Sequence, residues 1–198
     1  MAWLRRKKDT SEFKPDVNTS TWLKTARMTQ LQRLRLAKWV LYALTIVLAL
    51  VVQDSIMSQL RIFGATTDLA VAVILLITVL EGTEVGSLFV LIASTLYYFS
   101  GSAPNAVCIA LLSYWGIAAT MIRQMYMHRS RGSVTVFASL ALMGYEVSLF
   151  VVGLMNELTR FSRINSFILT GVYSCLALIL LYPLIHKIGL IGGNTWKE

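Results

Sequence analysis

The chain has 198 residues, of which 56% are apolar or aromatic and 14% are charged, and its mean hydropathy is +0.65. Because soluble domains carry about 25% charged residues, this composition excludes a disordered chain, a disulfide scaffold and almost any soluble enzyme. Residues 85–122 and 164–186 contain no charge, and a membrane-spanning helix needs about 20 such residues. The sequence therefore predicts an integral membrane protein of the all-α class.

The net charge of +8 is concentrated near the N-terminus. Residues 1–38 hold ten Lys or Arg and three acidic residues, a charge of +7, which leaves +1 for the other 160 positions. A basic block directly before an apolar run is what the positive-inside rule predicts for a cytoplasmic N-terminus. We interpret it as a topology signal that also contacts anionic lipid, in preference to a nucleic-acid site.

The chain divides into three predicted parts. Residues 1–37 are expected to form a basic cytoplasmic tail and then, from Thr19, an amphipathic helix on the inner leaflet. Residues 38–187 are expected to form a transmembrane helical bundle, and residues 188–198 a cytoplasmic C-terminal tail.

Six helices are expected in the bundle, two of them short. The run from Leu69 to Leu80 is about 18 Å long as a helix, whereas the hydrocarbon core is about 30 Å thick. This run and the next form either two spans or a re-entrant hairpin. The long uncharged stretch must bend at residues 100–105, where Pro104 suits the start of a helix. The expected segments are 39–57, 69–80, a stretch after Gly86 that ends at Phe99, 104–127, 134–155 and 164–185.

The distribution of basic residues orients this bundle. With the N-terminus inside, the cytoplasmic segments hold 15 Lys or Arg and the outer loops hold three, namely Arg61, Arg160 and Arg163. The asymmetry predicts that both termini are cytoplasmic, and a hairpin at the second and third segments would not change this. The expected location is a cell membrane, with the basic segments on its cytoplasmic side.

Glu146 is the clearest candidate for a functional residue, because a carboxylate in hydrocarbon costs about 2.5 to 3.5 kcal/mol. One interpretation is a hydrogen bond inside the bundle, to Ser113, Tyr114, Tyr173 or Ser174. The others are partner contact or a bistable bundle, and proton or solute movement. We expect Glu146→Gln to preserve folding, and Glu146→Leu to loosen the bundle or its partner contact.

The second group of candidates flanks the short apolar run. Asp68 and Glu81, like Glu84, are expected to be helix ends in contact with water. Gly82 and Gly86 have the spacing that lets another backbone approach closely, so both are candidates for structure or partner binding. Enlarging either to Leu is expected to prevent association and to leave the chain folded.

No arrangement of residues suggests catalysis. The two histidines, His128 and His186, lie far apart, and the two cysteines, Cys108 and Cys175, lie in apolar runs. A zinc site needs three or four ligands, and no protease or phosphate-loop motif occurs. The sequence predicts a protein that is not an enzyme and has no catalytic residue, metal or cofactor.

Residues 62–102 contain a series of short motifs, and one more follows in the fifth expected segment: Ile62-Phe63-Gly64, Asp68-Leu69, Glu81-Gly82 with Gly86, Ser100-Gly101-Ser102 and Tyr145-Glu146. The order of these motifs resembles the bacterial rod-shape-determining MreD family. The chain lacks the family's Pro before Asp68 and has Tyr97 where many members have an Asp. Its N-terminal lead-in is also longer.

The resemblance implies a non-enzymatic scaffold of the cell-wall elongation machinery, the elongasome, which determines cell shape. Its partner would be an MreC-like single-span protein, docked by helix packing inside the membrane. The RodA glycosyltransferase of peptidoglycan synthesis and its transpeptidase would be indirect partners.

A second hypothesis is the substrate-binding subunit of an energy-coupling-factor vitamin transporter. These subunits are also compact bundles of about six transmembrane helices, and the MreD family is similar to them in fold. The chain lacks their Ala-xxx-Ala coupling pattern, because Val47 follows Ala43 by four residues. No cluster of Trp, Asn and Glu suggests a vitamin pocket.

Overall fold

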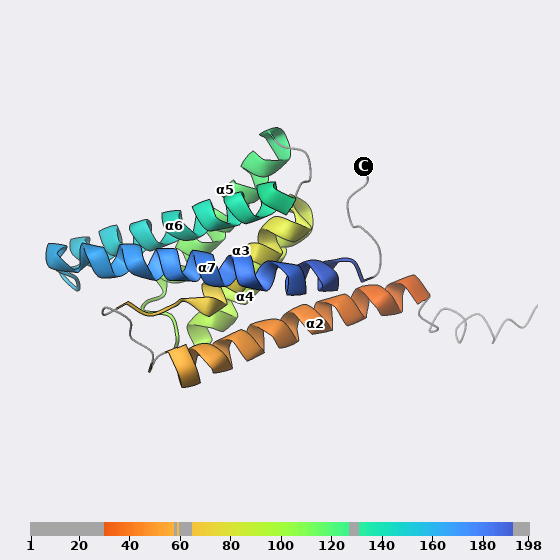
Figure 1. Cartoon of the computed structure of the whole chain (residues 1–198), viewed down its shortest axis with the longest axis horizontal. Helices are drawn as coiled ribbons and strands as arrows, with labels where there is room; N and C mark the ends of the chain where they lie inside the picture. The colour runs from red at the N-terminus through yellow and green to blue at the C-terminus, as the bar shows by residue number, and fades with distance from the viewer. Residues whose placement is uncertain (1–29, 58, 60–64, 127–130, 192–198) are drawn as a thin grey trace, which may run out of the picture.

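The computed structural model describes residues 30–57, 59, 65–126 and 131–191, and these residues contain helices but no β-strand. Figure 1 shows the helices packed side by side in one bundle, with the start of α2 and the end of α7 at the same end. The α-helices are α2 (Gln30–Val52), α3 (Leu69–Glu81), α4 (Thr83–Phe99), α5 (Val107–Tyr126), α6 (Arg131–Met155) and α7 (Ile164–Gly189).

Within the described residues, four helical segments are long and apolar enough to cross a membrane: Gln32–Ile56, Val107–Tyr126, Gly132–Met155 and Phe161–Gly189. Their outward faces carry exposed Leu, Ile and Val side chains, as expected of helices that face lipid. The chain is therefore an all-α, multi-pass membrane protein. The helices α3 and α4, with 13 and 17 residues, are the two short helices that the sequence predicts.

The short helix α3 is the centre of the bundle. Every residue from Ala70 to Glu81 is buried, and α3 packs against each of the five other α-helices that the structure describes. Its sequence explains this position, because a helix that is apolar on every side has no face that favours solvent. In Figure 1 the yellow α3 lies among the surrounding helices.

A single glycine, Gly82, joins α3 to α4. Its φ is +93°, a conformation that side chains with a Cβ rarely adopt, so the chain reverses direction within one residue. Four residues later Gly86 packs against the backbone of α3, and a Cβ placed on Gly86 would lie 2.5 Å from the carbonyl oxygen of Thr78. Both glycines therefore serve the fold of this chain, and the expectation that Gly86→Leu acts on association alone is wrong.

The first helix differs from the sequence prediction at both ends. Its described part is one continuous helix from Gln30 to Val52, so residues 30–37 extend the spanning helix itself. The predicted tail and the start of the predicted amphipathic helix, residues 1–29, lie outside the described residues. A short π-helical turn, Gln53–Met57, ends the segment and places Gln53 over the N-terminus of α3.

The opposite end of the chain agrees more closely with the prediction. A 3₁₀ turn, Phe161–Arg163, leads into α7, which ends at Gly189, four residues beyond the predicted end at Ile185. The predicted C-terminal tail lies outside the described residues from residue 192 onward.

Candidate functional site

A buried ion pair holds the C-terminal end of α3. The Nζ atom of Lys38 lies 2.6 Å from Oε1 of Glu81, and the two side chains are 3% and 2% exposed. The hydroxyl of Tyr42 also donates a hydrogen bond of 2.6 Å to Glu81. Lys38 and Tyr42 lie one turn apart on α2, so these contacts attach α2 to the central helix.

A second buried cation, Arg123, binds a backbone carbonyl at the same end of α3. The guanidinium of Arg123, at the end of α5, donates a hydrogen bond to the carbonyl of Val79. Carbonyls in the last turn of a helix lack helical partners, and cations interact favourably there. The expectation that Glu81 contacts water is wrong, because Lys38 and Tyr42 cover it and bind it.

The N-terminal end of α3 is held by polar side chains from three other segments. Asp68 caps the helix by accepting a hydrogen bond from the Val71 N–H, and the Tyr97 hydroxyl of α4 donates to its other oxygen at 3.0 Å. The Gln53 side chain accepts from the Ala70 N–H at 2.8 Å, and Ser174 of α7 accepts from the Asp68 N–H at 2.8 Å. Tyr97 therefore serves as a partner of Asp68.

Burial of the Asp68 carboxyl raises its pKa to about 6, although the hydrogen bonds from Tyr97 and Val71 oppose this shift. Asp68 is thus half-buried and internally bonded, and it is not a freely solvated helix end.

A polar cleft opens above this end of α3. Its volume is about 790 Å³, and it brings together acidic, basic and hydroxyl side chains from α4, α6 and α7, from the π-helical turn after α2 and from the connecting segments. We call it the polar cleft, and it is lined by Gln53, Asp54, Thr66, Thr67, Asp68, Tyr97, Gly101, Ser102, Pro104, Glu146, Leu149, Arg163, Ser166, Phe167 and Thr170.

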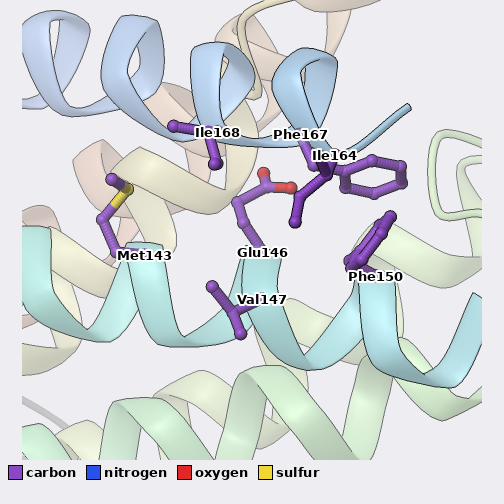
Figure 2. Close-up of a pocket in the computed structure, with 7 residues that line it drawn as sticks. All are labelled: Met143, Glu146, Val147, Phe150, Ile164, Phe167 and Ile168. Carbon is purple, nitrogen blue, oxygen red and sulfur yellow. The ribbon is translucent and has the colours of Figure 1, made fainter. Parts of the chain in front are cut away.

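A smaller cavity lies between α6 and α7. Figure 2 shows its lining side chains, with the Glu146 carboxyl pointing from α6 toward Phe167 and Ile164 on α7. We call it the apolar notch; its volume is about 110 Å³, and it is lined by Met143, Glu146, Val147, Phe150, Ile164, Phe167 and Ile168. Glu146 and Phe167 line both the notch and the polar cleft, so the two cavities adjoin.

Glu146 is 6% exposed, and none of the described residues forms a hydrogen bond or an ion pair with its carboxyl. Two of its predicted partners are engaged elsewhere, since Ser113 bonds to Ser94 and Ser174 accepts from the Asp68 N–H. The predicted hydrogen bond inside the bundle is therefore not made. A buried polar group without a partner is costly, which marks Glu146 as a candidate binding group.

The structure separates the predicted site residues into two kinds. Contacts within the chain account for Asp68, Glu81, Gly82 and Gly86. Of the predicted site residues, Glu146 alone has a side chain that bonds to none of the described residues. Sequence reasoning missed Lys38 and Arg123 as buried cations. The only available signal was that Lys38 directly precedes the first apolar run, a place where a cation can also reach water.

The described residues contain no group of His, Cys, Asp or Glu that could hold a metal ion, and both cysteines are free thiols. Comparison with family models, with curated proteins and with solved structures gave no match.

Proposed function

We propose that this protein is a non-enzymatic membrane scaffold, similar in role to the MreD family, that docks the spanning helix of an MreC-like partner. The observation that supports it best is the apolar notch with the unpaired Glu146 at its edge. On this proposal the protein lies in the bacterial cytoplasmic membrane, and both of its termini are on the cytoplasmic side. RodA and its transpeptidase would be reached through the partner.

The notch has the position that a docking site for a transmembrane helix requires. Val147 of α6 and Ile168 of α7 are 58% and 49% exposed, so the notch opens sideways, toward the membrane. Inside a bilayer, helices associate through close packing and a few polar contacts, because lipid tails are as apolar as Leu.

The size of the notch limits what it accepts. A dry apolar cavity of about 150 Å³ holds a benzene molecule. The notch, at about 110 Å³, therefore has room for one aliphatic side chain of a partner helix. Phe150 and Phe167 form one wall, with ring centroids 5.2 Å apart, and would give that side chain a rigid surface.

Co-purification in mild detergent with the single-span coiled-coil protein of the same host tests this proposal. Ile168→Trp fills the notch, and we expect it to weaken the complex by about tenfold or more. Leu180→Trp is the matched control, because Leu180 lies on the same helix, is 79% exposed and does not line the notch. Equal binding by both variants, or normal rod-shaped cells after depletion, would contradict the proposal.

The polar cleft favours a second candidate, the substrate-binding subunit of an energy-coupling-factor transporter. A cleft of about 790 Å³ with several polar groups lies within the usual range of small-molecule sites, about 300–1,000 Å³. Tight vitamin binding by the purified chain, together with co-purification of an ATPase pair, would favour this candidate over the scaffold.

A further inference from the structure

Two charged side chains that line the polar cleft have no partner among the described residues. One is Glu146, which is buried, and the other is Arg163, which is exposed at the start of α7. The side chain of Arg163 forms no ion pair or hydrogen bond within the described part of the chain. The cleft thus offers one carboxylate and one guanidinium to a ligand.

The other charged groups of the cleft are already engaged. Asp68 binds Tyr97 and the Val71 N–H, and Asp54 accepts hydrogen bonds from Ser102 at 2.9 and 3.1 Å. The first amides of α3 are also occupied, by Asp68 and Gln53, so the helix N-terminus is not an open anion site. What the cleft lacks is a cationic donor for Glu146 and an anion for Arg163.

We propose that the polar cleft binds an ethanolamine phosphate group, with its ammonium on Glu146 and its phosphate on Arg163. A primary ammonium supplies N–H donors to a buried carboxylate, which a quaternary ammonium cannot do. A guanidinium matches phosphate oxygens in a two-point geometry. The hydroxyls of Ser166 and Thr170, on the first turns of α7, are further donors on the same wall.

This chemistry is carried by a phospholipid headgroup or by a free phosphoethanolamine compound. The cleft adjoins the apolar notch, which opens toward the membrane, so a headgroup can enter it from the bilayer. Both proposals involve Glu146, which lines the notch and the cleft, but Ile168 lines the notch alone and Arg163 lines the cleft alone, so variants of these two residues test the two proposals separately.

The test compares ligands that differ only in their N–H donors. The full-length protein is purified in detergent, and its melting temperature is measured with O-phosphoethanolamine or with phosphocholine. In a second arm it is placed in nanodiscs of phosphatidylcholine, with or without phosphatidylethanolamine of the same acyl chains. At ten times Kd, a ligand of the native state raises the melting temperature of a chain this size by about 3–6 °C.

We expect ethanolamine compounds to raise the melting temperature and choline compounds to leave it unchanged. A response in the lipid arm alone assigns the ligand to the bilayer, and a response to the free compound alone assigns it to the aqueous phase; either supports the proposal. Glu146→Gln and Arg163→Gln should each weaken the response about tenfold or more. The matched control is Arg160→Gln, since Arg160 is exposed on the same turn but does not line the cleft.

Three outcomes would overturn the proposal. They are equal stabilisation by choline and ethanolamine compounds, a full ethanolamine response in Arg163→Gln, and no response in either arm. Loss of the partner complex in Ile168→Trp with the ethanolamine response retained would leave both proposals standing. Retention of the complex with loss of the response in Arg163→Gln would show that the two sites act separately, which supports the ligand site.

Discussion

The buried ion pair between Lys38 and Glu81 provides the sharpest test of the fold. In Lys38→Met the Glu81 carboxylate keeps its burial but loses the cation that lies 2.6 Å away. Removing one partner of a buried pair costs about 3–5 kcal/mol, because the remaining charge is left uncompensated. For a chain of about 200 residues, each kcal/mol lowers the melting temperature by about 2–4 °C, so we expect a loss of about 6–20 °C.

The double variant Lys38→Met with Glu81→Leu separates charge from packing. Replacing both charges by apolar side chains of similar volume is often close to neutral. The remaining cost is the hydrogen bond that Tyr42 makes to Glu81, about 1–3 kcal/mol. The double variant should therefore be more stable than Lys38→Met alone.

Thermal unfolding in detergent, followed by tryptophan fluorescence, measures all three proteins. Arg35→Met is the control, because Arg35 is an exposed cation on the same helix and should change stability by less than about 0.5 kcal/mol. If Lys38→Met had the same melting temperature as the Arg35→Met control, or if the double variant were less stable than Lys38→Met alone, the assignment of a coupled buried pair would be refuted.

Three further predictions concern Gly86, Asp68 and Glu146. Gly86→Ala should lower the melting temperature, because its Cβ would meet the Thr78 carbonyl oxygen at 2.5 Å, whereas Gly132→Ala has open space and should not. The pKa of Asp68 is raised from 3.8 to about 6. The stability that the protonated Asp68 carboxyl contributes is therefore complete below pH 3.8 and is lost as the pH rises through 6. Asp68→Asn should remove this pH dependence of the melting temperature and keep the N-cap of α3. Glu146→Leu should keep or raise the melting temperature while abolishing ligand binding, contrary to the sequence-based expectation that the bundle loosens, because Glu146 bonds to no described residue. A loss of stability in that variant would show that the carboxyl has a partner within the chain.

The helices themselves could be predicted because local chemistry determines them. Uncharged runs, the Glu81-Gly82 break and the polar turn before Pro104 are properties of neighbouring residues, and they place all six α-helices of the described chain close to their observed positions. The burial of α3 on all sides also follows from its composition, since Leu69–Glu81 has no polar face to turn outward.

The contacts of the charged residues could not be predicted in the same way. Lys38 and Glu81 are 43 residues apart, and Arg123 and Val79 are 44 apart, so no periodicity relates them. At the end of an apolar run, a long cationic side chain can extend to water or fold back on a carboxylate, and only the packing of α2 and α5 on α3 decides between the two. The same packing occupies Ser174 with the Asp68 N–H and leaves Glu146 without its expected partner.

The short length of α3 explains why the bundle contains a polar cleft at all. Thirteen residues extend about 20 Å, whereas the hydrocarbon core is about 30 Å thick, so the central helix covers only part of the depth. Lys38 and Arg123 bind the C-terminal end of α3, and the polar cleft lies at the opposite end, beside Asp68. There polar side chains from the π-helical turn after α2 and from α6 and α7 line the cleft. Glu146 lies at the boundary between that space and the membrane-facing notch, and its position therefore follows from where α3 ends.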